Sequence, residues 1–247
     1  MQLYIIRHCQ SENNALWLRT GGGDGRLADP PLTEIGHQQA KHLASYIGGA
    51  NGEDANLLLD PVDRGGIDIT HLYCSLMDRS IETGFNIARK LELPLKARED
   101  IHERGGIYLR DPQSEERIGL PGPSRDDFGR KYPALILPDT LGSEGWWNRP
   151  YEDQQTALLR AHSFLNWLLD THDGKDDRVA IITHAGFMQS LFLAIFGVDE
   201  LRTNLGSSRN LWFKANNGSI TRLDFHEDFV RLSYQNRVDF IPTELLT

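Results

Sequence analysis

Residues 3–14, LYIIRHCQSENN, begin like a β-strand and change polarity abruptly at Arg7 and His8. The first four residues of the stretch are apolar or aromatic, as in a short buried strand. In α/β proteins, catalytic and binding side chains are placed on the loop that follows such a strand. The stretch therefore predicts an α/β fold with a functional site at the end of its first strand.

Strand-like and helix-like segments alternate along the chain. After the first strand comes an amphipathic helix at 32–49, then a strand at 67–75 with a helix at 77–93, and a strand at 178–184 with a helix at 185–197. Three such units in order predict a mostly parallel sheet with helices on both faces, which is a three-layer α/β sandwich.

The remaining segments complete the expected organisation. Residues 104–150 are rich in Gly, Pro, Arg and Asp and lack periodicity, so we expect a capping insertion there. A long helix is expected at 151–172. Short antiparallel strands are expected at 211–215, 219–225 and 229–234. Because no linker divides the chain, we expect one domain over residues 1–247.

The composition excludes some classes of partner. The 247 residues carry 26 Lys and Arg against 35 Asp and Glu, which gives a formal net charge of −9. Nucleic acid is not expected as a partner, because binding the phosphate backbone needs a basic face. The longest apolar run, at 191–196, is too short to span a membrane. Two cysteines are too few for a disulfide framework, which favours a cytoplasmic protein. The sequence leaves the oligomeric state open.

Residues suited to phosphoryl chemistry lie at all three strand ends. Arg7 and His8 follow the first strand, Arg79 begins the helix after the second, and His184 follows the third. Parallel strands end at one edge of a sheet, so folding should gather these residues in one crevice. Arginine forks fit phosphate oxygens, and their charge keeps a nearby histidine neutral and nucleophilic. A carboxyl group in a loop, Glu103, suits proton donation to the leaving oxygen.

These residues lie in motifs that resemble the histidine phosphatase superfamily, the phosphoglycerate mutase-like proteins. RHCQSENN resembles the family's Arg-His-Gly-x-Ser/Thr-x-x-Asn signature, and PLTEIGHQQA resembles its Leu-Thr-x-x-Gly-x-x-Gln-Ala helix start. CSLMDRSIET is similar to its Ser-x-x-x-Arg-x-x-x-Thr element, ITHAGF to its second histidine motif, and NNGSITRLDF to its late strand. The motifs come in family order from residue 3 to about residue 225.

The resemblance implies a role for each matching residue. His8 is the expected nucleophile, Glu103 the proton donor and His184 the second catalytic histidine, with Glu99 and Asp100 open as alternatives to Glu103. The expected phosphate-binding residues are Arg7, Arg79, Asn14 and Ser11, with His184 also contacting the phosphoryl group. No cofactor and no metal are expected. Cys9 and Ala185 depart from the family pattern, in which both positions are commonly glycine.

Three functions fit this pattern. The first is a metal-independent phosphatase that hydrolyses a small phosphomonoester through a phosphohistidine. The second is a phosphoglycerate mutase, and the third is a catalytically weak module that binds a phosphorylated ligand. A His₂Glu zinc site is disfavoured, because the adjacent arginine charges oppose a dication. Arg26 is a possible substrate contact, and His71 is expected to lie on the surface without a partner. The insertion at 104–150 should set specificity.

Overall fold

The computed structural model describes residues 1–49, 63, 65–111, 113–198 and 212–247. Its main sheet has six strands in the order β3-β2-β6-β1-β7-β8. Strands β3, β2, β6 and β1 pair in parallel, whereas β7 and β8 are antiparallel. The strands are β1 (Gln2–Arg7), β2 (His71–Ser75), β3 (Leu95–Arg98), β6 (Arg178–Thr183), β7 (Ile220–Phe225) and β8 (Val230–Arg237).

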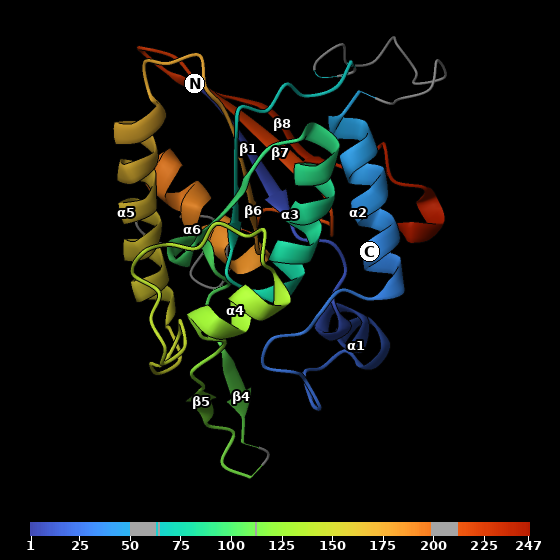
Figure 1. Ribbon diagram of the computed structural model, residues 1–247, viewed down its shortest axis with the longest axis vertical. Coiled ribbons are helices and arrows are strands. Elements are labelled where there is room, and N and C mark those ends of the chain that lie inside the picture. The colour runs from blue at the N-terminus through green and yellow to red at the C-terminus, as the bar shows by residue number, and fades with distance from the viewer. Residues whose placement is uncertain (50–62, 64, 112, 199–211) are drawn as a thin grey trace, which may run out of the picture.

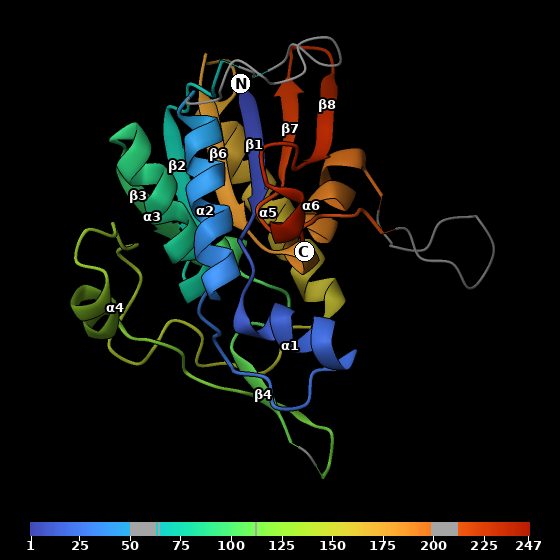
Figure 2. The same cartoon turned by 90° about the vertical axis from the view of Figure 1, so that its right-hand side faces the viewer.

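Helices cover both faces of this sheet (Figures 1 and 2), which confirms the expected three-layer α/β architecture. Helices α2 (Glu34–Ile47) and α3 (Asp78–Leu91) lie on one face. Helices α5 (Gln154–His172) and α6 (Ala185–Phe196) lie on the other. None of the helices in the described part of the chain is long and apolar enough to cross a membrane.

The side chains of β1 alternate between two hydrophobic cores, one on each face of the sheet. Tyr4 and Ile6 pack in the core beneath α2 and α3, and Leu3 and Ile5 pack in the core beneath α5 and α6. A strand that is buried on both faces reads as a continuous apolar run, as residues 3–6 do. The two cores hold β1 rigidly at the centre of the sheet, and with it the position of His8.

Helix α1 (Glu12–Thr20) was not expected from the sequence. It begins at Ser11, whose side chain accepts a hydrogen bond from the Asn14 backbone, while the Asn14 side chain accepts one from the Ser11 backbone. This is a capping box with asparagine in the place of the usual Glu or Gln. None of the residues of α1 is fully buried, so the apolar periodicity that identifies a helix from sequence is missing here.

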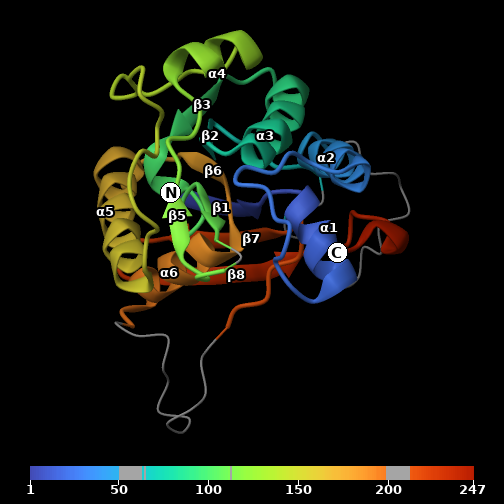
Figure 3. The same ribbon diagram turned by 90° about the horizontal axis from the view of Figure 1, so that it is seen from below.

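The segment at 104–150 contains regular structure, contrary to the expectation of an irregular insertion. A hairpin forms from β4 (Tyr108–Arg110) and β5 (Arg117–Gly119), and α4 (Arg125–Lys131) follows. The elements were missed because each has at most seven residues and periodicity needs a longer window. Together with α1 they lie at the carboxyl end of the parallel strands (Figures 1 and 3).

One expected strand in the tail is wrong. Residue 211 lies outside the described residues, and the rest of the expected strand at 211–215 has no strand structure. Side chains, rather than a neighbouring strand, form hydrogen bonds with the backbone of this segment. Gln189 accepts from Phe213 N at 2.9 Å and donates to Phe213 O at 2.7 Å. The strands expected at 219–225 and 229–234 are present as β7 and β8.

Two short 3₁₀ helices complete the chain, η1 (Glu99–Ile101) and η2 (Thr243–Leu245). The first follows β3 directly and leads into the loop that carries Glu103. The second lies near the C-terminus beside α2, where Gln39 donates to the carbonyl oxygen of Leu245 at 2.6 Å. The other side-chain atom of Gln39, Oε1, accepts from Gln10 N at 2.7 Å, so η2 and the loop after β1 are held by one buried residue.

Candidate active site

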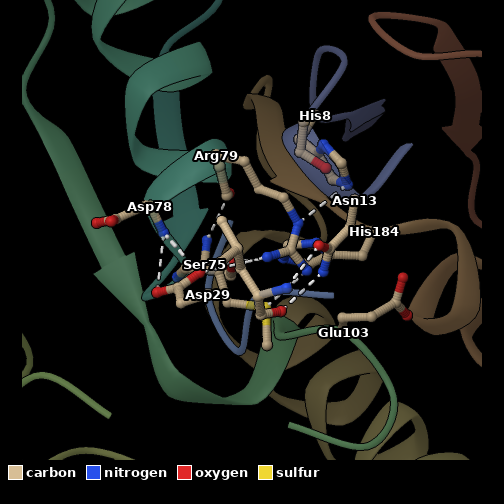
Figure 4. Close-up of polar contacts among 12 residues, drawn as sticks. His8, Asn13, Asp29, Ser75, Asp78, Arg79, Glu103 and His184 are labelled. Atoms are coloured by element: carbon tan, nitrogen blue, oxygen red, sulfur yellow. Dashed lines mark hydrogen bonds and ion pairs between the residues drawn. The ribbon is translucent and has the colours of Figure 1, made fainter. Parts of the chain in front are cut away.

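The carboxyl ends of β1, β2 and β6 bring His8, Arg79 and His184 together, as Figure 4 shows. All three side chains are buried. A cavity of about 350 Å³ opens beside them, between α1, the Gly-rich loop that follows it and the hairpin. The cavity is lined by Arg7, His8, Ser11, Asn13, Asn14, Leu16, Trp17, Gly22, Gly23, Arg26, Pro30, Arg79, Glu103 and Tyr108.

Hydrogen bonds determine which nitrogen of His8 carries the proton. Nδ1 lies 2.7 Å from the Cys9 carbonyl oxygen, which can only accept, so Nδ1 is the donor. Nε2 is then unprotonated, and Arg79 Nε donates to it at 3.2 Å. The imidazole therefore presents a lone pair beside the Arg79 guanidinium.

The surroundings of His8 keep its imidazole neutral. Burial lowers the pKa of His8 well below its usual value, and the charges of Arg79 and then Arg7 lower it further. The hydrogen bond to the Cys9 carbonyl favours the protonated form but is a smaller effect. A neutral imidazole is the form that can act as a nucleophile.

His184 lies beside His8, with the two ring centroids 4.9 Å apart. It does not line the cavity itself. Its Nε2 is 2.6 Å from Ser75 Oγ, and Ser75 Oγ also accepts from Met77 N at 3.3 Å. The Ser75 hydroxyl has one proton and two lone pairs, so it can donate to Nε2 or accept from it. Nδ1 is buried and has no hydrogen-bond partner in the described part of the protein.

Arg79 is held from three sides. Its Nε donates to His8, one terminal nitrogen lies 3.3 Å from Asp29 Oδ1, and the other lies 3.1 Å from Met77 Sδ. Asp29 also accepts from Asp78 N, in the first turn of α3, at 3.3 Å. Burial raises the pKa of the Asp29 carboxyl to about 7, although the Arg79 charge lowers it.

Arg7 is anchored by one terminal nitrogen, which donates to the Ala215 carbonyl at 2.6 Å. Its Nε is buried without a hydrogen-bond partner among the described residues. Burial lowers the pKa of Arg7 to about 10, and Glu103 opposes this effect. The guanidinium remains charged at neutral pH, so Arg7 and Arg79 are two fixed cations of the cavity beside His8.

Glu103 is the acidic residue that lines the cavity. Its Oε1 accepts from Arg104 N at 2.8 Å and lies over Gly186 in the first turn of α6. A Cβ at Gly186 would lie 2.3 Å from this oxygen, so a residue without a side chain leaves room for the carboxyl group. The alternatives point elsewhere: Glu99 accepts from Thr140 at 2.6 Å, and Asp100 pairs with Arg98 at 2.6 Å.

A family model described as the histidine phosphatase superfamily, branch 1, matches residues 3–237. The chain belongs to the histidine phosphatase superfamily. Apart from Gln2, the match covers every strand of the main sheet, together with all three strand ends that carry His8, Arg79 and His184.

One curated relative of this superfamily member is the transcription factor tau 55 kDa subunit of Saccharomyces cerevisiae. It is 27% identical over 233 residues, which are 91% of this chain and 47% of that protein. The chain thus spans about half the length of the curated relative.

Solved phosphatases share the fold. A phosphoserine phosphatase mutant from Entamoeba histolytica is 18% identical, with a TM-score of 0.57 over 98% of this chain and 99% of that one. A mycobacterial glucosyl-3-phosphoglycerate phosphatase is 16% identical, with a TM-score of 0.56 over 96% and 99% of the two chains. A putative α-ribazole-5′-P phosphatase from Escherichia coli is 17% identical, with a TM-score of 0.57 over 96% of each chain. These similarities concern the fold.

Ser11 and Asn14 line the cavity and also bond to each other. Asn14 Oδ1 accepts from Ser11 Oγ at 2.9 Å and from Asn217 Nδ2 at 3.1 Å. These donors orient the Asn14 amide, whose Nδ2 has no acceptor in the described part of the chain and is left for a ligand. Asn217 also donates to the His8 carbonyl at 3.0 Å, so this buried residue positions both His8 and Asn14.

The two departures from the family pattern leave the cavity open. The Cys9 side chain is fully buried in the core beneath α2 and α3, and it does not line the cavity. Burial raises the pKa of the Cys9 thiol to about 12, so the thiol stays protonated. Ala185 begins α6 directly after His184, at a position where its methyl group is compatible with the helix.

Sequence reasoning missed Asp29 and Tyr108. Asp29 is 50 residues from Arg79 along the chain, in a Gly- and Pro-rich loop without periodicity. Tyr108 lies in the hairpin, where its carbonyl accepts from Arg26 at 2.5 Å and its ring lies 3.8 Å from the Arg26 guanidinium carbon. The Arg26 and Tyr108 pair joins the Gly-rich loop to the hairpin across the cavity. Neither residue belongs to a motif, so no signal in one sequence marks them.

Proposed function

We propose that the chain hydrolyses a small phosphomonoester through a covalent phosphohistidine on Nε2 of His8. The observation that carries the proposal is the hydrogen-bond pattern of His8. The Cys9 carbonyl holds the proton on Nδ1, and the lone pair of Nε2 is directed at the Arg79 guanidinium. A neutral imidazole beside two fixed cations suits attack on a phosphorus whose oxygens those cations hold.

In the first step, His8 Nε2 attacks the phosphorus and forms a P–N bond while the bond to the leaving-group oxygen breaks. Glu103 gives its proton to that oxygen, so an alcohol departs. Arg7 and Arg79 stabilise the charge on the phosphoryl oxygens. Asn14, which Ser11 holds in place, and His184, whose ring centroid is 4.9 Å from that of His8, support the same oxygens in this proposal.

In the second step, a water molecule attacks the phosphorus of the phosphohistidine. Its proton goes to the Glu103 carboxylate, the P–N bond breaks and inorganic phosphate is released. His8 regains its lone pair, and Glu103 regains its proton. The reaction needs no metal, because the two guanidinium groups supply the positive charge that a metal would otherwise provide.

The surroundings of the cavity favour hydrolysis over transfer to a sugar acid. A mutase must hold a carboxylate as well as a phosphoryl group. Three cations of the insertion contact other groups: Arg125 bonds the Pro138 and Leu141 carbonyls, Arg130 pairs with Asp127, and Lys131 pairs with Asp78. Arg149 stacks on Trp147. Besides Arg7 and Arg79, the described residues provide the cavity with one further cation, Arg26.

A small substrate fits the dimensions of the site. The cavity of about 350 Å³ lies near the lower end of the range of ligand pockets, roughly 300–1,000 Å³. Trp17, Leu16 and Tyr108 give its outer part an apolar and aromatic lining. We therefore expect a small phosphomonoester, and the formal net charge of −9 supports the expectation that nucleic acid is not a partner.

The alternative is a module that binds a phosphorylated ligand with little turnover, as part of a larger assembly. The similarity to a transcription factor subunit favours this alternative. The buried state of the catalytic groups favours hydrolysis, since a binding module has no need of a neutral histidine held as a nucleophile beside a carboxyl group.

Release of phosphate from an aryl phosphate in the presence of a chelator distinguishes these functions. The same preparation is assayed for interconversion of 2- and 3-phosphoglycerate with the bisphosphorylated primer. We expect inorganic phosphate from several small phosphomonoesters and little interconversion. Efficient primer-dependent interconversion with negligible phosphate release would establish the mutase. Binding of phosphate without turnover would establish the binding module.

A further inference from the structure

A second cluster of polar side chains lies at the amino end of the parallel strands, opposite the active site. His71 is the first residue of β2, His172 is the last residue of α5, and Asp177 directly precedes β6. Because β2 and β6 are parallel neighbours, both begin at this end of the sheet. Figure 1 shows that α1 and the hairpin lie at the other end. His71 was expected to lack a partner, and this expectation is wrong.

The three side chains converge on a common point. His172 Nδ1 lies 2.8 Å from Asp177 Oδ2, and His71 Nδ1 lies 3.9 Å from Asp177 Oδ1. One ligand atom from each residue lies within 4.8 Å of the other two. The His71 and His172 rings meet edge to face, with centroids 4.7 Å apart. The His71–Asp177 distance is too long for a hydrogen bond, and His71 Nδ1 instead lies 2.9 Å from Thr70 Oγ1, a contact that a metal ion bound at Nδ1 would replace.

The spacing fits a tetrahedral ion. Two ligand atoms that each lie about 2.1 Å from such an ion are about 3.4 Å apart. The distances of 2.8 and 3.9 Å bracket this value, and no two of the three ligand atoms are more than 4.8 Å apart, so side-chain shifts of up to about 1.4 Å would accommodate an ion. The His71 and Asp177 side chains are partly exposed, at 33% and 19%, which leaves a route for the ion from solvent.

The second contact of His172, between its Nε2 and the Tyr73 hydroxyl, is of the kind that orients a metal-binding histidine. A histidine that binds metal through one nitrogen almost always donates its other N–H to a nearby polar group. Tyr73 Oη lies 3.3 Å from His172 Nε2 and is buried. Metal binding at Nδ1 displaces the proton shared with Asp177, and Nε2 then carries the ring proton toward Tyr73.

We propose that His71, His172 and Asp177 form a binding site for a divalent transition-metal ion, with Zn²⁺ as the best match. Two imidazoles and one carboxylate suit Zn²⁺, and water completes its coordination. The ion would join the end of α5 to the starts of β2 and β6. Its role is structural, because the site lies at the opposite end of the sheet from His8. The proposal is independent of the proposed phosphatase activity.

The test uses the tag-free full chain, freed of metal with a chelator and then titrated with Zn²⁺ by calorimetry. Bound zinc is counted by elemental analysis after dialysis. We expect one Zn²⁺ per chain and a higher melting temperature with Zn²⁺ than without. His71→Ala and Asp177→Asn should each weaken binding at least about 10-fold, as loss of a supporting residue alone does in known sites. His42→Ala removes an exposed histidine of α2 and is the matched control.

Circular dichroism of each metal-free variant shows whether the chain is folded. Because the His71 side chain is partly exposed, His71→Ala should disturb the fold little. It is therefore the decisive variant if Asp177→Asn disturbs the turn before β6. The proposal is wrong if the wild type binds no Zn²⁺, or if His71→Ala binds it as tightly as His42→Ala does. Loss of the melting-temperature increase in His71→Ala, with the increase kept in His42→Ala, supports it.

Discussion

Arg79 Nε lies 3.2 Å from Nε2 of His8, so a permanent cation donates a hydrogen bond to the nitrogen proposed as the nucleophile. This contact is possible only with an unprotonated Nε2, because a guanidinium has donors and no acceptor. A phosphoryl group bound here would lie between the two side chains. Its oxygens would then take over the Arg79 hydrogen bonds as Nε2 attacks the phosphorus.

Replacement of His8 by alanine should abolish turnover, with a loss of at least about 10³-fold in kcat. Brief incubation of the wild type with a labelled phosphomonoester should trap acid-labile phosphate on the protein, because a phosphorus–nitrogen bond hydrolyses readily in acid. His42→Ala, at an exposed site on α2, should keep full activity. Normal turnover by His8→Ala would refute the phosphohistidine mechanism.

Replacement of Arg79 by alanine should lower kcat/KM by about 10²–10³-fold, as the loss of one preorganised donor does in other enzymes. Arg79→Lys should recover only part of the loss. An ammonium group keeps the charge but cannot match the directions of the three contacts that the guanidinium makes with His8, Asp29 and Met77. Steady-state kinetics of both variants check this. Equal activity of Arg79→Lys and the wild type would show that charge alone suffices.

Replacement of Glu103 by glutamine should affect substrates according to their leaving groups. Alkyl phosphates need a proton on the leaving oxygen, whereas activated aryl phosphates do not, so the loss on alkyl phosphates should be larger by at least about 10²-fold. Glu99→Gln is the matched control, since Glu99 contacts Thr140 away from the cavity. A uniform loss on both kinds of substrate would indicate that Glu103 has a structural role.

Replacement of Gly186 by alanine should reproduce part of the Glu103 effect. The new Cβ would lie 2.3 Å from Glu103 Oε1, and the flexible carboxyl group should move away from it. We expect a loss of about 10-fold on alkyl phosphates, corresponding to about 1.4 kcal/mol in the barrier, with little change on aryl phosphates. Gly129→Ala, whose Cβ meets no atom within 4 Å, is the control. Unchanged leaving-group dependence would mean that the Glu103 position is not critical.

The free energy of unfolding should fall as the pH is lowered below 6.5. Burial holds the pKa values of His8, His102 and His184 well below that value, so these groups stay neutral in the folded protein. In the unfolded chain they take up protons near pH 6.5, and the unfolded state therefore binds more protons below that pH. Each histidine can contribute up to about 1.4 kcal/mol per pH unit.

Urea denaturation at pH 7 and pH 5.5 measures this dependence. His184→Asn should show a shallower slope than the wild type, because one of the three depressed groups is removed. An unfolding free energy that is equal at the two pH values would contradict the neutral state of the buried histidines.

Periodicity in the sequence determined five strands of the main sheet and its four covering helices, but missed the edge strand β3. The continuous apolar run at 3–6 matches a strand buried on both faces, and the face of Ala40, Leu43, Ala44 and Ile47 matches the buried side of α2. Such patterns can be recognised in a sequence because burial of a helix or strand places apolar residues at regular positions along it. The sequence also placed His8, Arg79 and His184 at one edge of the sheet, because parallel strands end together.

Only the tertiary structure decided how these residues act. The Cys9 carbonyl sets the tautomer of His8, Ser75 contacts His184, and Asp29 pairs with Arg79 from 50 positions away. Helix α1, the hairpin and the cluster of His71, His172 and Asp177 were also missed. Helix α1 has no buried residue and each hairpin strand has three residues, so neither leaves a readable period, whereas the cluster brings His71 to segments that are distant in the chain. Hydrogen-bond direction and charge pairing are properties of the folded arrangement, so they become visible only when the distances are known.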